Sequence, residues 1–534
     1  ARERLDGRRH QRDDRHQFGR HADEWPIPDR IGRRLGPTNS GGTVALQAVA
    51  SGPALTSTGS FALFGGSTFD VTLGAPTTTA LVATDLNLSY AGALVINANS
   101  TLAEGTYTLV SYGGNLAGSN NGFTSITGSS DFEYTAGVDT TAKLLTLQVV
   151  GAGLSWNGTT TTGSSGPVAG GSGTWTASNS VTNWTNSAGT SRVASDSAKA
   201  AIFAGTAGTV TVDTSSGPVG AKALKFLTSG FAITGGTLTL ANASTAPKVD
   251  VDGASTVATI SSVIAGSDGI EKIGAGTLIL SGANTYAGGT TITDGTLRIA
   301  SAGSLGAGSY SGAISLASGT LLDYASSATQ TLSGAITGTG GLTVSGTGTL
   351  TLSGANAYSG ATTIGSGAVV LSGGAAIGNQ SAVTVASGAS LTVNANETIG
   401  SLAGAGTVTL ANVSQLTAGG NNSSTTFSGV IGGIGSVEKA GTGTLTLSGT
   451  NTIIGAVTIS AGTLALSGDS TLPDTTELTL ATGATLELAN GSQSVVNLNG
   501  TGTVNLNANT LTVGANNGTG MFAGAITGTG GLTK

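Results

Sequence analysis

The sequence predicts an all-β protein whose main part is a right-handed parallel β-helix, and three observations support this fold class. Short aliphatic runs alternate with Thr and Ser, which is the period of half-buried strands. These runs recur every ~20–24 residues, about the length of one solenoid turn. No helical pattern is available to supply the crossovers that parallel strands need, so the chain must coil on itself. A series of antiparallel sandwiches is the second choice, but its turns would be spaced about 8–12 residues apart without the longer period.

Composition separates this chain from disordered low-complexity sequences and excludes several function classes. Gly supplies 89 of 534 residues and charged residues only 9%, yet 38% of the residues are apolar and these alternate in short runs. Because Cys is absent, disulfides and thiolate zinc sites are excluded, and we expect no metal and no cofactor. No apolar run reaches the roughly 18 residues of a membrane-spanning helix. Beyond residue 36 the net charge is −10, which argues against a nucleic-acid partner.

The N-terminal part changes composition abruptly near residue 36. Residues 1–36 hold ten Arg and all three His without apolar periodicity. We expect either a disordered basic leader or a leader that is not native to the protein. Residues 37–150 contain six short strand patterns, such as FDVTL and TYTLVSY, separated by Gly, Asn, Ser and Pro. This range is predicted to be a β-rich N-terminal segment.

Residues 151–250 form a Trp-containing β-segment that leads into the solenoid. Three of the four Trp residues, Trp156, Trp175 and Trp184, fall within 29 residues. Clustered Trp beside Asn and Gly is compatible with a surface that stacks carbohydrate. The alternative is an apolar cluster that caps the solenoid or packs its strands, and we favour this second interpretation.

Explicit repeats occupy residues 251–534. Three blocks align without gaps: copy 1 (263–300), copy 2 (335–372) and copy 3 (430–467). A fourth begins as AITGTGGLTK. Equivalent Ile residues at 264, 336, 431 and 526 are spaced by 72, 95 and 95 residues. These spacings predict steps of three, four and four rungs of about 24 residues each.

Alternation within the repeats predicts which side chains fill the bore. In the strand TLTL of copy 2, Leu350 and Leu352 point to one side and the two Thr to the other. The same rule applied to all three copies gives the expected structural core: Leu278, Leu280, Ile292, Leu297, Ile299, Leu350, Leu352, Leu445, Leu447, Leu464 and Leu466. We expect no catalytic, cofactor-binding or metal-binding residue. Gly between the strands provides the corners.

The motif G-x-G-T-L-x-L-S-G-x-N stands at 274–284, 346–356 and 441–451, followed each time by two more short strands. This pattern resembles the passenger-associated transport repeat of Gram-negative autotransporters. The resemblance implies a passenger at the cell surface, anchored in the outer membrane by a C-terminal β-barrel translocator that acts in cis. It also implies that the repeats assist export and folding. The expected role is a non-enzymatic β-helical stalk that supports adhesion, self-association or biofilm formation, with a host or cell-surface ligand.

Two features of that family are not found in the sequence, a signal peptide and the strand pattern of the barrel, and the sequence stops inside a repeat at Lys534. We therefore expect an internal fragment that is truncated at its C-terminus. One alternative is the carrier stalk of an autotransporter hydrolase whose catalytic domain lies elsewhere. Another is a repetitive ligand-binding or ice-binding solenoid that uses outward Thr rows.

Reactive chemistry is sparse in the sequence. The stretch GDSTL (468–472) has the letters of a serine esterase motif, but no His follows His21 to act as its base. The pair Asp250 and Asp252 lacks the further oxygen ligands of a calcium loop, so we expect a solvated turn there.

Overall fold

The computed structural model describes residues 43–47, 55–56, 60–62, 68–72, 79–83, 85–87, 93–97, 105–117, 125–127, 132–151, 153–158, 168–178, 182–185, 192–242, 245–411, 414–467, 472–514 and 517–534. The expected leader at 1–36 lies outside these residues. Contacts divide the chain into two compact units, residues 1–150 and 151–534. Within the described ranges the regular secondary structure is β-strand, apart from the short 3-10 helix η1 (Gly306–Gly308) and a 3-10 position at Asn517. No described helix is long and apolar enough to cross a membrane.

The first unit is a short coil of parallel strands closed by an antiparallel pair. One sheet contains β1 (Thr43–Gln47), β4 (Thr68–Thr72), β7 (Ala93–Asn97) and β10 (Ser125–Thr127). A second contains β2 (Leu55–Thr56), β5 (Thr79–Ala83), β8 (Gly105–Tyr112), β12 (Leu144–Gly151) and β11 (Phe132–Asp139), and a third contains β3 (Ser60–Ala62), β6 (Asp85–Asn87) and β9 (Leu116–Ala117). The strands of the first and third sheets pair in parallel, as do β2 with β5 and β5 with β8, whereas β12 runs antiparallel to β8. Three strands are therefore visited per turn.

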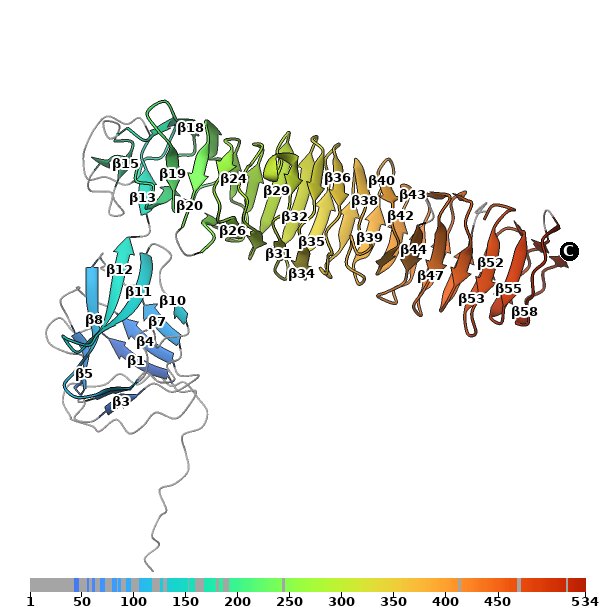
Figure 1. Ribbon diagram of the computed structural model, residues 1–534, viewed down its shortest axis with the longest axis horizontal. Coiled ribbons are helices and arrows are strands. Elements are labelled where there is room, and N and C mark those ends of the chain that lie inside the picture. The colour runs from blue at the N-terminus through green and yellow to red at the C-terminus, as the bar shows by residue number, and fades with distance from the viewer. Residues whose placement is uncertain are drawn as a thin grey trace, which may run out of the picture. The chain divides into compact units, whose positions relative to one another are not determined.

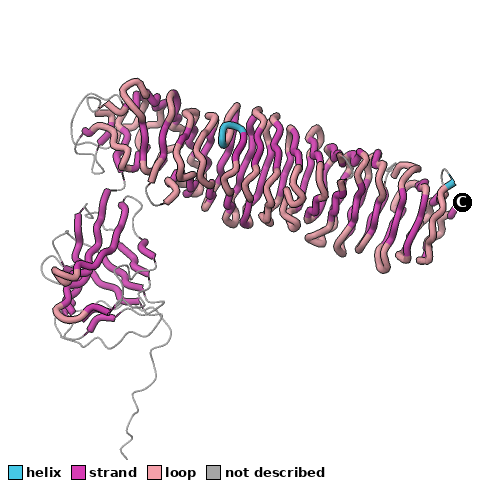
Figure 2. Tube along the Cα trace, in the orientation of Figure 1, coloured by secondary structure: helices cyan, strands magenta, loops and turns pink. Residues whose placement is uncertain are grey.

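The second unit is a parallel β-solenoid with three faces, which Figure 1 and Figure 2 show as a stack of similar rungs. Face 2 is one uninterrupted 17-stranded sheet. Its strands are β14 (Gly173–Thr176), β18 (Thr209–Asp213), β21 (Ala232–Gly235), β24 (Val257–Ile260), β27 (Thr277–Leu280), β29 (Thr296–Ser301), β32 (Leu321–Ser326), β35 (Gly341–Val344), β37 (Thr362–Ile364), β39 (Ala382–Val385), β42 (Ser401–Gly404), β45 (Thr425–Phe427), β48 (Thr444–Leu447), β51 (Thr463–Leu466), β53 (Thr485–Leu488), β56 (Thr503–Asn505) and β58 (Ala525–Thr527).

Face 1 consists of two sheets in succession, of ten and six strands. The first sheet has β16 (Arg192–Val193), β15 (Trp184–Thr185), β13 (Gly153–Trp156), β17 (Ala200–Phe203), β20 (Ala223–Phe226), β23 (Lys248–Val251), β26 (Ile270–Ile273), β28 (Thr290–Ile292), β31 (Ile314–Leu316) and β34 (Ile336–Gly338). The second sheet has β41 (Glu397–Ile399), β44 (Gln415–Ala418), β47 (Ser436–Lys439), β50 (Val457–Ile459), β52 (Glu477–Leu480) and β55 (Asn497–Gly500).

Face 3 consists of three sheets in succession, of three, eight and three strands. The first has β19 (Val219–Ala221), β22 (Leu238–Leu240) and β25 (Ile264–Ala265). The second has β30 (Ser309–Tyr310), β33 (Gln330–Leu332), β36 (Thr349–Leu352), β38 (Ala368–Leu371), β40 (Ser390–Val393), β43 (Thr407–Leu410), β46 (Val430–Gly433) and β49 (Thr452–Ile453). The third has β54 (Gln493–Val495), β57 (Leu511–Val513) and β59 (Leu532–Thr533).

The bore of the solenoid is filled by alternate residues of these strands. In β27, β36 and β48 the burial pattern alternates, with the Leu residues inward. The eleven expected core residues are all at most 3% exposed. Gly295, Gly367 and Gly462 directly precede the last strand of each copy and have φ of +67°, +66° and +64°. A Cβ there would also lie within about 2.5 Å of a carbonyl oxygen in the rung below, so only Gly fits these corners.

The rungs are shorter than the block spacing suggested. From Thr277 to Thr444 the chain covers 167 residues and eight steps of face 2, which is about 21 residues a rung. The 72- and 95-residue spacings therefore correspond to about three and one-third and four and two-thirds rungs, and the expectation of whole rungs of 24 was wrong. As a result, the strands with the sequence TLxL in copies 1 and 3, β27 and β48, lie on face 2, and the equivalent strand of copy 2, β36, lies on face 3.

The Trp cluster closes the N-terminal end of the bore. Trp156, Trp175 and Trp184 are at most 2% exposed, the Trp184 ring centroid lies 5.0 Å from each of the other two in edge-to-face pairs, and all three rings lie next to Phe203. Here β13, β15 and β16 pair antiparallel, unlike the rungs that follow. Buried rings cannot stack on a sugar, so these residues are a packing cluster and not a carbohydrate surface.

Candidate functional site

In each copy one buried Asn reaches back to the preceding rung. Its side-chain oxygen accepts a hydrogen bond from the main-chain amide of the Ile that opens the copy. The three pairs are Ile264 with Asn284 (3.0 Å), Ile336 with Asn356 (2.7 Å) and Ile431 with Asn451 (2.9 Å). All three Asn are at most 5% exposed. Each Asn thus connects two rungs. The contact stabilises the fold, because a buried main-chain amide without a hydrogen-bond partner would be costly.

About two rungs after the Asn of each copy, a second buried polar side chain makes a similar contact. We call the Ile, the Asn and this second side chain, which follow one another along the solenoid, a column. It accepts from the main-chain amide of a buried aliphatic residue, Leu305, Ile377 or Leu472, in the rung between. The three acceptors are Gln330 (2.7 Å), Glu397 (2.8 Å) and Gln493 (3.1 Å). Glu397 also accepts from Ala376 at 2.9 Å with its other oxygen. Copies 1 and 3 therefore use a carboxamide where copy 2 uses a carboxylate.

These columns stand where one sheet ends and the next begins. On face 1 the ten-stranded sheet ends at β34 with Ile336, and the next sheet starts at β41 with Glu397. On face 3 the breaks fall between β25 and β30 and between β49 and β54, at copies 1 and 3. Because the backbone does not form a ladder across these rungs, the side chains supply the hydrogen bonds that strands would otherwise provide.

A buried Lys performs a related task in copies 1 and 3. The Lys272 ammonium donates to the carbonyl oxygens of Ile273, Gly274 and Asp294 at 3.0, 2.6 and 3.1 Å. Lys439 makes the equivalent three bonds at 2.6, 2.9 and 3.2 Å. Burial lowers the pKa of Lys272 to about 8, although Asp294 and Asp250 act in the opposite direction. Burial also lowers the pKa of Lys439.

Copy 2 has Val344 at the position of these Lys residues. There the Ser366 hydroxyl donates to the carbonyl of Gly346 at 2.9 Å, the equivalent of Gly274 and Gly441. One of the carbonyls that Lys serves in the other copies therefore keeps a partner, from a different side chain.

Buried hydroxyl groups form a series of hydrogen bonds, here called a hydroxyl chain, that begins in copy 1 and another that begins in copy 2. Tyr358 contacts Thr362 at 2.6 Å, Thr362 contacts Ser381 at 2.8 Å, and Ser381 donates to Gly360 at 2.7 Å. In copy 1, Tyr286, Thr290 and Tyr310 form the same chain at 3.0 and 2.8 Å. Burial raises the pKa of Tyr310 to about 12 and that of Tyr358 further. The phenols therefore stay neutral hydrogen-bonding groups.

Copy 3 replaces this chain with aliphatic side chains. Ile453 and Val457 occupy the positions of Tyr358 and Thr362, and both are buried. Thr476, the equivalent of Ser381, is fully buried and its hydroxyl has no hydrogen-bond partner among the described residues. Copy 3 therefore lacks the middle hydroxyl, which in copy 2 contacts both of its neighbours, and the Thr476 hydroxyl has lost its partner.

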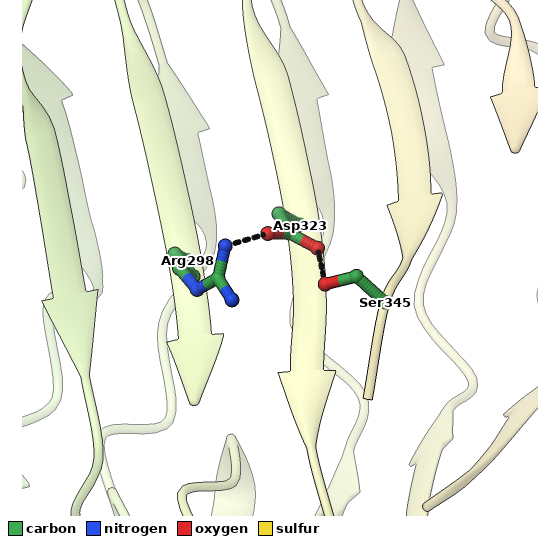
Figure 3. Close-up of polar contacts among 3 residues, drawn as sticks. All are labelled: Arg298, Asp323 and Ser345. Atoms are coloured by element: carbon green, nitrogen blue, oxygen red, sulfur yellow. Dashed lines mark hydrogen bonds and ion pairs between the residues drawn. The ribbon is translucent and has the colours of Figure 1, made fainter. Parts of the chain in front are cut away.

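The outward side of face 2 carries one small polar cluster, shown in Figure 3. Arg298 Nη1 lies 2.8 Å from Asp323 Oδ2 on the next strand, and the Ser345 hydroxyl donates to Asp323 Oδ1 at 2.6 Å. Asp323 stands in register between Arg298 and Thr343. The cluster interrupts the outward Thr row, which is therefore not the regular array that an ice-binding surface requires.

The other groups considered from the sequence are not assembled into a reactive centre. Asp250 lies on β23 and not in a turn, with its carboxylate 3.9 Å from Lys225, so the expectation of a solvated turn was wrong for this residue. Burial raises its pKa, and Lys225 counteracts that effect. Residues 468–471 of GDSTL lie outside the described ranges. Within those ranges no three His, Asp or Glu gather to hold a metal ion.

The buried Asn residues belong to the recurring motif, yet sequence reasoning assigned them no role. The signal was available: the same Asn ends the motif in all three copies, 20 residues after the Ile that it contacts. Gln330, Glu397 and Gln493 could not be found this way, because they lie outside the repeated blocks.

A family model described as passenger-associated-transport-repeat matches residues 270–299, 342–371 and 437–466, inside the three copies. The adhesin BmaC autotransporter of Brucella suis biovar 1 (strain 1330) is 34% identical over 268 residues, which is 48% of this chain. The chain spans 8% of the length of that relative. No solved structure matches the chain. Repeats of this family on a parallel β-solenoid, together with the similarity to an autotransporter adhesin, indicate a surface-exposed autotransporter passenger with such repeats.

Proposed function

We propose that this chain is a non-enzymatic stalk of an autotransporter passenger that supports adhesion, self-association and biofilm formation. The main observation behind the proposal is that face 2 is an uninterrupted 17-stranded sheet and that one continuous hydrophobic core runs along it. Such a stack is long and each rung contacts only its neighbours, which suits a rigid spacer with a large outer surface. The relative that matches half of the chain is named an adhesin, which supports the same role.

The repeats serve export and folding in this proposal. Their buried side chains join residues 20–25 positions apart, so a copy can close as soon as the adjacent rungs are present. The TLxL strands β27 and β48 of copies 1 and 3 lie on face 2 and the equivalent strand β36 of copy 2 lies on face 3, so a receptor that contacts one face would not meet the same residues in all three copies. What the copies share is internal. The partner in cis is an outer-membrane β-barrel translocator.

Adhesion is tested by display of the full chain, fused to a heterologous translocator, on Gram-negative cells that lack adhesins. We expect more attachment to host cells or abiotic surfaces, and more settling of the culture, than with the translocator alone. Equal attachment and equal settling at equal surface amounts would exclude the adhesive role.

The export role is tested with the same display system. Asn451→Leu keeps the side-chain volume but leaves the Ile431 amide unpaired, so we expect less passenger at the surface and more protease-sensitive chain inside the cell. Asn394→Leu is the matched control, because the Asn394 side chain is exposed and makes no hydrogen bond to another rung among the described residues. A similar loss in both variants would show that the bridge is not the cause.

A further inference from the structure

We propose that six β-branched side chains on face 3 form a contact surface for a second copy of this chain. The surface, here called the β-branched patch, consists of Thr407, Thr409, Val430, Ile434, Thr452 and Ile454. This inference rests on the self-association in the proposed function and names the surface that carries it. All six side chains are exposed, and Val430, Ile434 and Ile454 are 37%, 55% and 64% exposed.

The patch lies on three neighbouring strands of face 3, β43, β46 and β49, with Ile434 and Ile454 directly after the ends of β46 and β49. Thr407 is in register with Val430, and the amide of Ile454 donates to the carbonyl of Gly433, so Ile434 and Ile454 stand one above the other in adjacent rungs. Gly432, between Val430 and Ile434, is buried, and the Thr452 side chain lies against it. Val430, Ile434 and Ile454 therefore form an exposed apolar group with Thr side chains beside it.

The two Ile residues are a property of copy 3 and not of the fold. In copy 2 the same positions hold Thr339 and Ser359, and the amide of Ser359 donates to the carbonyl of Gly338 just as in copy 3. Copy 1 has Ser267 and Ala287 there. All four of these residues are exposed, so the fold accepts a polar or small residue at these two positions. The fold therefore does not explain two stacked, exposed Ile residues, and a contact outside the chain does.

The chemistry of the patch favours a second copy over a charged partner. None of the residues of β43, β46 and β49 is charged, so two patches can face each other although the chain carries a net charge of −7. β-branched side chains have few rotamers, so little side-chain entropy is lost on contact. A patch that meets itself across a twofold axis makes an isologous contact, the commonest kind in homo-oligomers.

The size of the patch sets the strength of the contact. The three aliphatic side chains expose roughly 300 Å², less than half of the ~800 Å² per partner in a stable interface. We therefore expect a weak contact in solution that becomes effective when many copies face one another on two surfaces, because the contacts then act together.

The test uses the full chain coupled to beads at high density. The double variant Ile434→Thr/Ile454→Ser gives copy 3 the residues of copy 2, and we expect roughly tenfold less bead aggregation, with unchanged circular dichroism and thermal unfolding. Wild-type beads mixed with variant beads should leave the variant beads out of the aggregates. The reciprocal variant Thr339→Ile/Ser359→Ile should increase aggregation. Val257→Thr is the control, because Val257 is an exposed aliphatic residue on another face.

Undiminished aggregation of the double variant would overturn the proposal, and so would co-aggregation of variant with wild-type beads. Loss of binding to host cells or lipid vesicles without any bead–bead aggregation would show that the patch meets another partner, which also overturns it. The adhesive function fails separately: beads that aggregate through the patch but attach to no cell would leave the self-contact standing and exclude adhesion to host cells.

Discussion

Copies 2 and 3 share a motif and a backbone path, but they fill the bore differently. Copy 2 carries the Tyr358–Thr362 hydroxyl chain where copy 3 has Ile453 and Val457. Copy 2 has Val344 where copy 3 buries Lys439. The exchanges run in opposite directions, so neither copy is simply the more polar one.

The comparison teaches that buried polar groups in this solenoid change in sets. Tyr358 and Thr362 are replaced together, and the loss of Lys at Val344 is accompanied by Ser366, which serves one of the same carbonyls. Thr476 shows what an incomplete exchange leaves, a buried hydroxyl without a partner. The reason is that a lone buried polar group costs more than a hydrogen bond gains.

The largest effect should come from the feature that both copies keep. Asn356→Leu leaves the Ile336 amide and the Ala376 carbonyl unpaired, so we expect a loss of about 2–4 kcal/mol in the free energy of unfolding. Asn451→Leu removes only one bond between rungs and should cost less. Denaturant unfolding, with hydrogen exchange at the Ile336 amide, measures both. Equal stability of wild type and Asn356→Leu would contradict the bridge.

The next effect depends on pH and separates copy 2 from copies 1 and 3. Burial raises the pKa of Glu397 from 4.5 to about 7, although the amides of Ala376 and Ile377 act in the opposite direction. The folded state therefore binds more protons than the unfolded state between pH 4.5 and 7. Stability should be greatest below pH 4.5 and fall by on the order of 2–3 kcal/mol as pH rises to 7.

Glu397→Gln, which copies Gln330 and Gln493, should flatten that pH profile. The measurement is the melting temperature of wild type and variant from pH 4 to 8, compared as a difference so that other acids cancel. Glu487→Gln, on an outer face, is the control. If the variant and the wild type follow parallel curves, Glu397 is not the titrating group.

A smaller effect is expected where copies 2 and 3 differ in their buried hydroxyl groups, at positions 362 and 457. Thr362→Val leaves Tyr358 without its partner and should cost about 1–3 kcal/mol. Val457→Thr offers a partner to Thr476 and should cost little or stabilise by up to about 1 kcal/mol. A double variant with Thr476→Val tests whether the gain depends on that hydroxyl. Similar costs at positions 362 and 457 would show that the two copies do not differ as described.

The smallest effect should be on the outer face. Arg298→Gln removes an ion pair whose Arg side chain is 43% exposed, while Asp323 keeps its bond from Ser345. We expect a change of about 0.5 kcal/mol that shrinks with added salt. Urea unfolding at low and high salt measures it. A loss as large as that of Asn356→Leu would mean that the outer face, and not the bore, holds the rungs together.

Much of the fold could be predicted from particular residues. The alternation of Leu350 and Leu352 with Thr predicts the inward face directly, because the strand period is two. The length of a rung could not be predicted from the blocks, since the 72- and 95-residue spacings are not whole numbers of turns. Glu397 was likewise hidden, because its partners lie 20–21 residues earlier in the chain and are defined only by the stacking of rungs.

The sequence by itself determined the repeat, its strands and the aliphatic core, because these depend on local periodicity and on motifs that recur along the chain. Only the tertiary structure decided which face each copy occupies and which side chain meets which amide. Those depend on the rung length of about 21 residues, a global quantity set by how the corners close. Because the spacing between copies is not a whole number of rungs, copy 2 occupies another face although it keeps the motif G-x-G-T-L-x-L-S-G-x-N.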